Sequence, residues 1–344
     1  MLEKPLRVAL LGCGFASEFH LKAWRMVPGA EVVALCDPNP ANAQSRAREF
    51  GVGRVFESIP ALLRTIEVDA YDVATPPETH REVAEQLVTA GKPVLCQKPL
   101  AMTLEDARAI VDLYAERRIR LMVNENWRWR VWFQEIKRQL QAGAVGEPFY
   151  ARLSIRSPAA VPTLEYPDSF LIPRQPRLKG MPRLIILEFL VHHIDTMRFL
   201  FGNVNSIYTQ VRSPVRTVAG ETVVTLLMNQ GPVLGLLDTS WASYGYPTTT
   251  SADTMVVEGT GGSLFLDSDA RVTLYRANGR IERIPVDTTD SYVRMYWGAI
   301  NHFAECLRSG APFQTDGPDN LKTLEVTFRA YESAKENTVI HWSR

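Results

Sequence analysis

The sequence predicts an α/β protein of two parts: a doubly wound parallel α/β domain over residues 1–124, followed by an α+β domain with an open, largely antiparallel sheet over residues 125–344. Three observations support this prediction. Short, nearly unbroken apolar runs alternate with helical patterns up to residue 124, as expected of strands buried on both faces of a parallel sheet. Beyond that residue, segments with alternating polar and apolar residues follow one another. Gly and Asn turns separate several of these segments, as they do in antiparallel sheets.

Length and composition limit the class of protein. The chain has 344 residues, long enough for two domains, and its hydrophobic fraction of 46% is typical of a globular protein. The formal net charge is zero, so no global field favours nucleic acid or an anionic membrane. Neither a transmembrane run nor a signal-peptide pattern is present, which leads us to expect a cytoplasmic protein. The cysteines lack metal-ligand spacing and are expected to be reduced core residues: Cys13, Cys36, Cys96 and Cys306.

The first element is a strand at 6–11, followed directly by a glycine turn and a helix. Glycine lets the backbone turn sharply and lets a ligand come close to it. The amides of the first helical turn favour negative charge, so a pyrophosphate is the expected ligand. The full dinucleotide-binding fingerprint has a third Gly or Ala where this chain has Ser17, a residue small enough to pack there. The predicted cofactor contacts of this loop are Gly12, Cys13, Gly14, Phe15 and Ala16.

A second predicted strand, 31–36, ends at Asp37, which lies 23 residues beyond Gly14. This is near the spacing of about 20 at which an acid binds the adenosine ribose in a Rossmann domain. A carboxylate there accepts hydrogen bonds from both ribose hydroxyls and repels a 2′-phosphate. Because no Arg or Lys lies between Asp37 and Arg46 to offset that charge, NAD is favoured over NADP. The alternative is that Asp37 only opens the turn 37–40.

The rest of the first part alternates in the same way. Helices are expected at 41–50, 58–66, 78–90 and 104–117, and strands at 70–74, 93–96 and 121–123. Thr103 fits an N-cap, with Asp106 in the position where a capping box prefers Glu or Gln. Ligands of open parallel sheets bind across the carboxyl ends of the strands. The residues at those ends that we expect to touch the cofactor are Thr75, Pro76, His80, Gln97 and Lys98.

The second part begins with an aromatic and basic segment, 126–130, and a predicted helix at 133–142. A proline-rich stretch at 158–180 is expected to be an ordered loop over the site. The predicted strands are 149–156, 207–211, 222–228, 233–241, 254–258, 263–266, 272–275 and 281–284. One helix, 184–200, interrupts them, and two more, 296–308 and 320–336, close the chain.

Two groups of residues are candidates for catalysis. Lys98 follows a strand at the carboxyl edge of the first part, where its ammonium could stabilise a developing alkoxide; the alternative is a loop lysine in solvent. Glu188, His192 and Asp195 recur at spacings of four and three on an apolar helix, which predicts one polar face suited to proton transfer. The alternatives are a buried helix with satisfied polar groups or a metal site, which is disfavoured because no further His or Cys lies nearby. His193 projects elsewhere and is expected to pack or to border the cofactor.

Together these motifs resemble the Gfo/Idh/MocA family of NAD(P)-dependent sugar oxidoreductases, and the resemblance covers nearly the whole chain. Two positions depart from the family pattern: Gln97 stands where the family has Glu, and Glu188 where it has Asp. The motifs that carry the resemblance are Gly12-x-Gly14 with His20, the turn 75–80, Gln97-Lys98-Pro99, the segment 126–129, the Glu188/His192/Asp195 set, and 301–333.

The resemblance implies a mechanism and partners. His192 would deprotonate a sugar hydroxyl, Lys98 would hydrogen-bond that oxygen, and hydride would pass to C4 of the nicotinamide. Glu188 would orient His192 or reach the substrate, and homodimers or homotetramers would form through the C-terminal sheet. Asn126 is expected beside the cofactor, and the expected sugar-facing residues are Trp127, Arg128, Trp129, Trp241 and Tyr296. The alternatives are a non-enzymatic NAD- and sugar-binding regulator, imine or bilin reduction, and NAD-assisted glycoside cleavage.

Overall fold

The computed structural model describes residues 4–167, 169–246 and 252–342. By its contacts the chain divides into two compact units, one comprising residues 1–129 and 292–322 and the other residues 130–291 and 323–344. The first unit therefore contains a C-terminal segment that a single boundary at residue 124 does not include. The prediction that residues 1–124 bind the dinucleotide, and that residues 125–344 bind the substrate and form the oligomer, stays a prediction.

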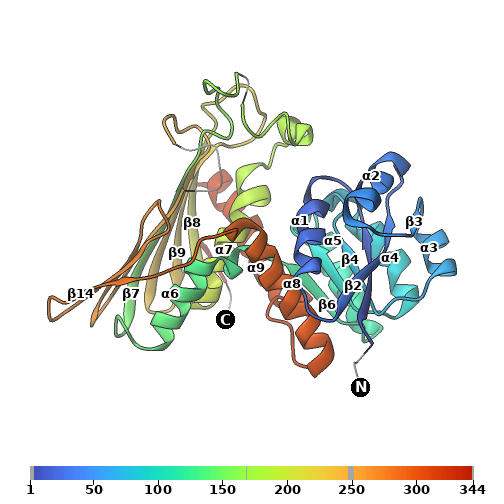
Figure 1. Cartoon of the computed structure of the whole chain (residues 1–344). Coiled ribbons are helices and arrows are strands. Elements are labelled where there is room, and N and C mark those ends of the chain that lie inside the picture. The colour runs from blue at the N-terminus through green and yellow to red at the C-terminus, as the bar shows by residue number, and fades with distance from the viewer. Residues whose placement is uncertain (1–3, 168, 247–251, 343–344) are drawn as a thin grey trace. The chain divides into compact units, whose positions relative to one another are not determined.

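The first unit is a doubly wound parallel sheet with the strand order β3-β2-β1-β4-β5-β6, as predicted (Figure 1). The order reverses between β1 and β4, and the crevice outside the carboxyl ends at such a switch point is where ligands bind. The strands are β1 (Leu6–Leu11), β2 (Ala30–Cys36), β3 (Val55–Phe56), β4 (Ala70–Val73), β5 (Val94–Gln97) and β6 (Leu121–Asn124). The helices are α1 (Phe15–Arg25), α2 (Pro40–Phe50), α3 (Ile59–Thr65), α4 (His80–Leu87), α5 (Leu104–Glu116) and α8 (Ser291–Ser309), with short 3₁₀ turns at Pro77–Thr79, Val88–Ala90 and Trp127–Trp129. Of these elements, β3 and the turn at Trp127–Trp129 were not predicted, and the helix predicted over 78–90 is an α-helix only over His80–Leu87.

Local sequence explains where these helices begin. Asn39 and Ser58 cap α2 and α3 by accepting hydrogen bonds from backbone amides of the first turn. The predicted cap of α5 is confirmed: Thr103 Oγ1 accepts from the Asp106 amide at 3.1 Å. The Thr103 hydroxyl also donates to the Asp106 carboxylate at 2.7 Å, so the acid is used within the cap.

The second unit is built on a nine-stranded sheet with the order β14-β13-β12-β11-β7-β10-β9-β8-β15. Only the β7–β10 pair among these strands is parallel, and α7 packs against β10 (Figure 1). The predicted strands are all present, with ends displaced by at most two residues: β7 (Pro148–Arg156), β8 (Ser206–Arg212), β9 (Val223–Gln230), β10 (Val233–Ser240), β11 (Ala252–Gly259), β12 (Gly262–Leu266), β13 (Val272–Arg276) and β14 (Ile281–Ile284). The remaining elements are α6 (Val131–Gln141), a 3₁₀ turn at Pro176–Gly180, α7 (Val191–Phe201), α9 (Gly317–Glu336), whose first six residues belong to the first unit, and the unpredicted β15 (Ile340–His341).

The continuous α-helix predicted over 184–200 is wrong in its first part. Residues Ile186–Leu190 form a π-helix, and only from Val191 does the chain continue as an α-helix. The first turn of this segment is capped from elsewhere in the second unit: the buried Glu221 carboxylate accepts from the Ile186 amide at 3.0 Å, and the Tyr331 hydroxyl accepts from the Leu187 amide at 3.1 Å. In a π-helix the backbone hydrogen bonds join residues five apart. The α-helical period of 3.6 residues therefore does not predict which side chains share a face across this junction.

All four cysteines are reduced and buried, as predicted. Burial raises the pKa of Cys13 to about 12 and that of Cys36 to about 11, so both thiols stay protonated at neutral pH. No helix within the described residues combines the length and apolar character needed to span a membrane.

Candidate active site

The glycine loop lies between β1 and α1, and its shape requires glycine at one position. Gly12 has φ +89°, and a Cβ there would lie 2.7 Å from the Thr75 amide nitrogen at the end of β4. Ser17, at the position of the third glycine, is fully buried and donates to the Gly14 carbonyl at 2.6 Å, so the substitution is accommodated. The N-cap of α1 is Gly14, which has no side chain to accept from the amides of the first turn. Amides at such a helix N-terminus favour the negative charge of a pyrophosphate.

Asp37 stands at the carboxyl end of β2 with its carboxylate fixed against this loop. One oxygen accepts from the Cys13 amide at 2.6 Å, and the other accepts from the Asn39 amide at 2.8 Å. The bond from the Asn39 amide is the turn contact that the sequence offered as the alternative role of Asp37. The carboxylate makes it together with the bond from the Cys13 amide. Each carboxylate oxygen has a further lone pair, so the predicted ribose contact is compatible with both bonds.

His80 holds two loops of the first unit together. Its Nδ1 lies 3.1 Å from the Leu100 carbonyl and its Nε2 lies 3.0 Å from the Thr75 carbonyl. The side chain is buried, and desolvation lowers its pKa. His80 therefore supports the loops that follow β4 and β5 by contacts within the protein. A direct contact with the cofactor stays a prediction.

Lys98 follows β5, is half-buried, and has its backbone held by Gln97. The Gln97 Oε1 accepts from the Lys98 amide at 2.7 Å, so the amide group of that side chain faces His20 Nε2, 3.0 Å away. On the other side, His20 Nδ1 lies 2.9 Å from the Asp72 carboxylate, which can only accept. A buried chain of hydrogen bonds therefore runs from Asp72 through His20 and Gln97 to the Lys98 amide.

Sequence reasoning noted His20 but missed its partners. Asp72 is completely buried, and the Trp24 indole donates to it at 2.7 Å. Asn124, at the end of β6, places its amide 3.1 Å from His20 Nε2. An acid in the otherwise apolar strand 70–74 was the available signal, because a buried carboxylate needs partners.

Removing the imidazole should destabilise this unit. His20→Ala is expected to lower the free energy of unfolding by about 3 kcal/mol, because it leaves the buried Asp72 carboxylate with one donor fewer and opens a cavity. Chemical denaturation followed by circular dichroism measures this. His341→Ala, at an exposed histidine, is the matched control. If both variants lower the free energy of unfolding by the same small amount, His20 does not stabilise the buried Asp72 carboxylate.

Tyr296 belongs to α8 and lies in the same unit as the Lys98 loop. Its ring stacks on Phe19 at a centroid distance of 5.5 Å and contacts His20 at 5.3 Å. Its hydroxyl hydrogen-bonds with the side chains of Asn126 and Gln97, and burial raises its pKa well above the ordinary value. Tyr296 thus contacts residues predicted to touch the cofactor, while its contact with a sugar stays a prediction.

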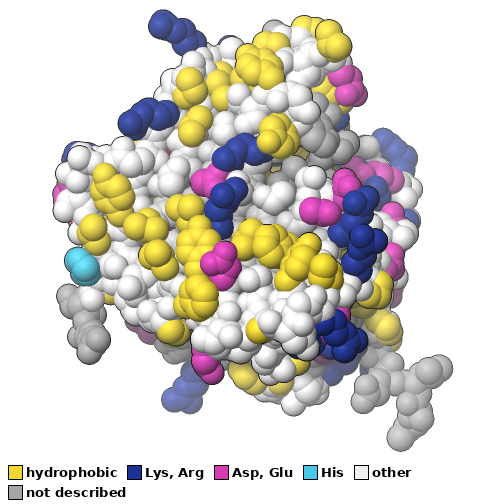
Figure 2. Space-filling model, turned by 90° about the vertical axis from the view of Figure 1, so that its left-hand side faces the viewer, with side chains coloured by type: hydrophobic (Ala, Val, Ile, Leu, Met, Phe, Trp, Pro, Cys, Tyr) yellow, Lys and Arg dark blue, Asp and Glu magenta, His cyan; other side chains and the backbone are white. Residues whose placement is uncertain are grey.

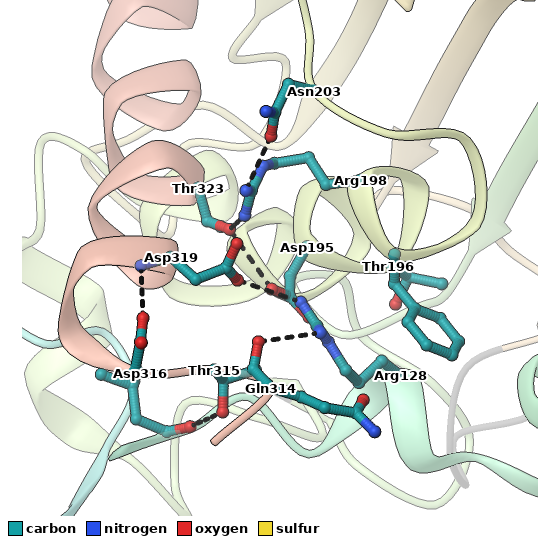
Figure 3. A network of polar contacts seen from close by, with 12 residues as sticks. Arg128, Asp195, Thr196, Arg198, Asn203, Gln314, Thr315, Asp316, Asp319 and Thr323 are labelled. Carbon is teal, nitrogen blue, oxygen red and sulfur yellow. Dashed lines mark hydrogen bonds and ion pairs between the residues drawn. The ribbon is translucent and has the colours of Figure 1, made fainter. Parts of the chain in front are cut away.

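Arg128, predicted to face the substrate, is 95% buried and has partners within the first unit. Its guanidinium donates to the Gln314 carbonyl at 3.4 Å and lies 3.5 Å from the Asp319 carboxylate (Figure 3). The neighbouring Trp129 packs on His302, with ring centroids 5.2 Å apart. Trp127 is also buried. These side chains connect the segment after β6 to the C-terminal residues of this unit, and their sugar contacts stay predictions.

Glu188 lies in the π-helix of the second unit and pairs with Arg177. The Arg177 Nη2 to Glu188 Oε1 distance is 2.7 Å, and the Glu188 side chain is about 10% exposed. Arg177 comes from the proline-rich loop that the sequence predicted to be ordered. Sequence reasoning did not single it out, because nothing in the loop indicates which residue would meet Glu188.

His192 and Asp195 follow on α7 and are both buried. Asp195 accepts from Thr323 Oγ1 at 3.2 Å, and Arg198 donates to that same hydroxyl oxygen at 2.6 Å (Figure 3). Asp195 therefore anchors α7 to α9. His193 packs against the Phe189 ring and lies 3.4 Å from the Asp253 carboxylate, in agreement with the packing role.

Trp241, whose sugar contact stays a prediction, lies in the second unit. Trp241 is buried and packs on Phe189, with ring centroids 5.4 Å apart. Within the described ranges, no group of three or more His, Cys, Asp or Glu side chains is arranged to hold a metal ion.

Comparison with known proteins supplies the family. An "Oxidoreductase family, NAD-binding Rossmann fold" model matches residues 6–125, and a "GFO/IDH/MocA C-terminal domain" model matches residues 133–265. The chain belongs to the Gfo/Idh/MocA family. It is 35% identical to D-apiose dehydrogenase of Paraburkholderia graminis over 98% of this chain and 90% of that relative, and 32% identical to D-apiose dehydrogenase of Rhizobium rhizogenes over 97% of each.

A solved structure agrees with this membership. The crystal structure of an oxidoreductase from Agrobacterium radiobacter, in complex with NAD+, L-tartaric acid and magnesium, is 30% identical and superposes with a TM-score of 0.89 over 98% of both chains. This Gfo/Idh/MocA protein is an NAD-dependent dehydrogenase that acts on a CH–OH group. NAD fits the structure, because a Cβ built at Gly14 would have no heavy atom of the described residues within 4 Å, and this side-chain-free residue is the N-cap of α1.

Proposed function

We propose that this enzyme oxidises a hydroxyl group of an aldose or a polyol, and that D-apiose is the first substrate to test. The observation that carries the proposal is the identity of 35% with a D-apiose dehydrogenase along nearly the whole chain. When bound, NAD supplies the chemistry by accepting hydride at C4 of its nicotinamide.

We propose that His192 is the general base and that Lys98 donates a hydrogen bond to the reacting oxygen. A positioned base contributes about a hundred- to ten-thousand-fold in rate, and the burial of His192 supports a fixed position. The half-buried Lys98, with its backbone held by Gln97, is suited to stabilising a developing alkoxide. Glu188, held by Arg177, orients His192 or binds a second substrate hydroxyl.

The assay follows absorbance at the NADH band while the protein and NAD are mixed with D-apiose and a panel of aldoses, polyols and lactones. We expect NADH to form with D-apiose or a close relative. Tight NAD binding without NADH formation from any sugar would favour the regulator. Release of a leaving group without net NADH would favour glycoside cleavage.

We also propose that the outer face of the nine-stranded sheet pairs with a second copy of the chain. Apolar side chains lie side by side in register on this face: Leu227 opposes Leu236, and Val256 opposes Phe265 (Figure 2). The alternating burial of β9 and β10 places one row in the core and this row at the surface. Light scattering should give two or four times the chain mass of 38.7 kDa, whereas a monomer would contradict the proposal.

A further inference from the structure

Arg46, on α2, approaches the glycine loop, although it is distant from it in sequence. Its Nη2 lies 3.5 Å from the Gly14 carbonyl. The Asp37 carboxylate reaches the adjacent residue of the same loop, where it accepts from the Cys13 amide at 2.6 Å. A guanidinium and the acid predicted to bind the ribose thus contact neighbouring residues of one turn. The sequence argument for NAD had relied on the absence of a cation before Arg46, and the fold brings Arg46 itself to this turn.

Two carboxylates hold this guanidinium. Glu49 Oε2 lies 2.6 Å from Arg46 Nη1, and Glu18 Oε2 lies 3.5 Å from Arg46 Nη2. The Arg46 side chain is 19% exposed, so these pairs are partly shielded from solvent. Glu18 also binds Lys22 at 2.5 Å, and that hydrogen bond, with the charges of Lys22 and Arg46, lowers the pKa of the Glu18 carboxyl. Glu18 is therefore ionised at neutral pH, and we call Glu18 and Glu49 together the clamp on Arg46.

We propose that Arg46 is a latent 2′-phosphate-binding residue and that Glu18 and Glu49 help to set the preference for NAD by occupying it. An Arg beside the acid at the end of the second strand is the group that accommodates the 2′-phosphate of NADP. Here Asp37 repels that phosphate, and the clamp directs the guanidinium toward protein carboxylates. Asp37 and the clamp are therefore two independent barriers to NADP binding. Removing only one of them should raise the affinity for a 2′-phosphate very little.

The test measures binding of adenosine 2′,5′-bisphosphate and of 5′-AMP by calorimetry, so it needs no sugar and is independent of the proposed substrate. The variants are Asp37→Ser, Glu18→Gln with Glu49→Gln, and all three changes combined. Arg46→Met is then added to the triple variant. Arg48→Met, at an exposed arginine of the same helix, is the matched control.

The triple variant should bind the bisphosphate about tenfold more tightly than Asp37→Ser does, because a charge-assisted guanidinium–phosphate pair becomes available. Adding Arg46→Met should abolish that gain, and adding Arg48→Met should not. The proposal is overturned if the higher affinity for the bisphosphate persists after Arg46→Met is added. It is also overturned if a folded triple variant binds the bisphosphate no more tightly than Asp37→Ser does. If the triple variant does not fold, Asp37→Ser/Glu49→Gln, which loses the nearer carboxylate partner of Arg46, is compared with the same variant carrying Arg46→Met, and equal bisphosphate affinities in these two overturn the proposal as well.

Discussion

Lys98→Met is expected to lower kcat for sugar oxidation at least about a hundredfold, because it removes the hydrogen bond that the proposed mechanism directs to the developing alkoxide. The substitution keeps the aliphatic stem, and Gln97 continues to hold the backbone amide of residue 98. NAD affinity should therefore change little. Steady-state kinetics and NAD titration by fluorescence separate the two effects.

Lys92→Met is the matched control for this variant. Lys92 precedes the same strand at its opposite end and pairs only loosely with the exposed Glu67, at 3.2 Å. Its replacement should leave turnover unchanged. Turnover near the wild-type value in Lys98→Met would exclude Lys98 from the mechanism.

His192→Ala is expected to reduce kcat/KM at least about a hundredfold, since no other group of the proposed mechanism accepts the hydroxyl proton. The acid limb of the pH dependence of kcat/KM should disappear with the imidazole, because protonation of the base no longer limits the rate. Added imidazole should restore part of the activity. Stopped-flow or steady-state assays across pH 5–9 measure these effects.

The control for His192→Ala must exclude a structural loss. His192 is buried on α7, and its carbonyl accepts from Thr196 Oγ1 at 2.8 Å, a contact that alanine preserves. Thermal unfolding near the wild-type temperature, with normal NAD binding, would show an intact fold. An unchanged pH profile with high activity would remove His192 from the role of base.

Much of the fold follows from local sequence patterns. The apolar run of β1 predicted a strand buried on both faces, and the alternation along β9 and β10 predicted strands with one buried face. Thr103 and Asp106 identified the start of α5 because the cap is made within four residues. Such signals are short-range, so a reading of neighbouring residues recovers them.

The candidate site was predicted less completely. The position of Asp37 against the glycine loop followed from the order of strand, turn, helix and strand. The pairing of Glu188 with Arg177 did not, because the two residues are 11 apart and joined by an irregular loop. Arg46 was noted only for its distance from Asp37 along the chain, whereas its location depends on how α2 packs beside α1.

Local patterns along the chain are enough to predict the α/β class, the glycine loop between β1 and α1 and the residue types available for hydride-transfer chemistry, because each depends on backbone preferences and side-chain periods within a few residues. Only packing brings together Glu221 and the start of the helix at Ile186–Leu190, His20 and Asp72, and Arg46 and Glu18. In each of these pairs, a buried or half-buried charge has a partner from another element. Pairings of that kind depend on packing in three dimensions, on which the local pattern of residues carries no information.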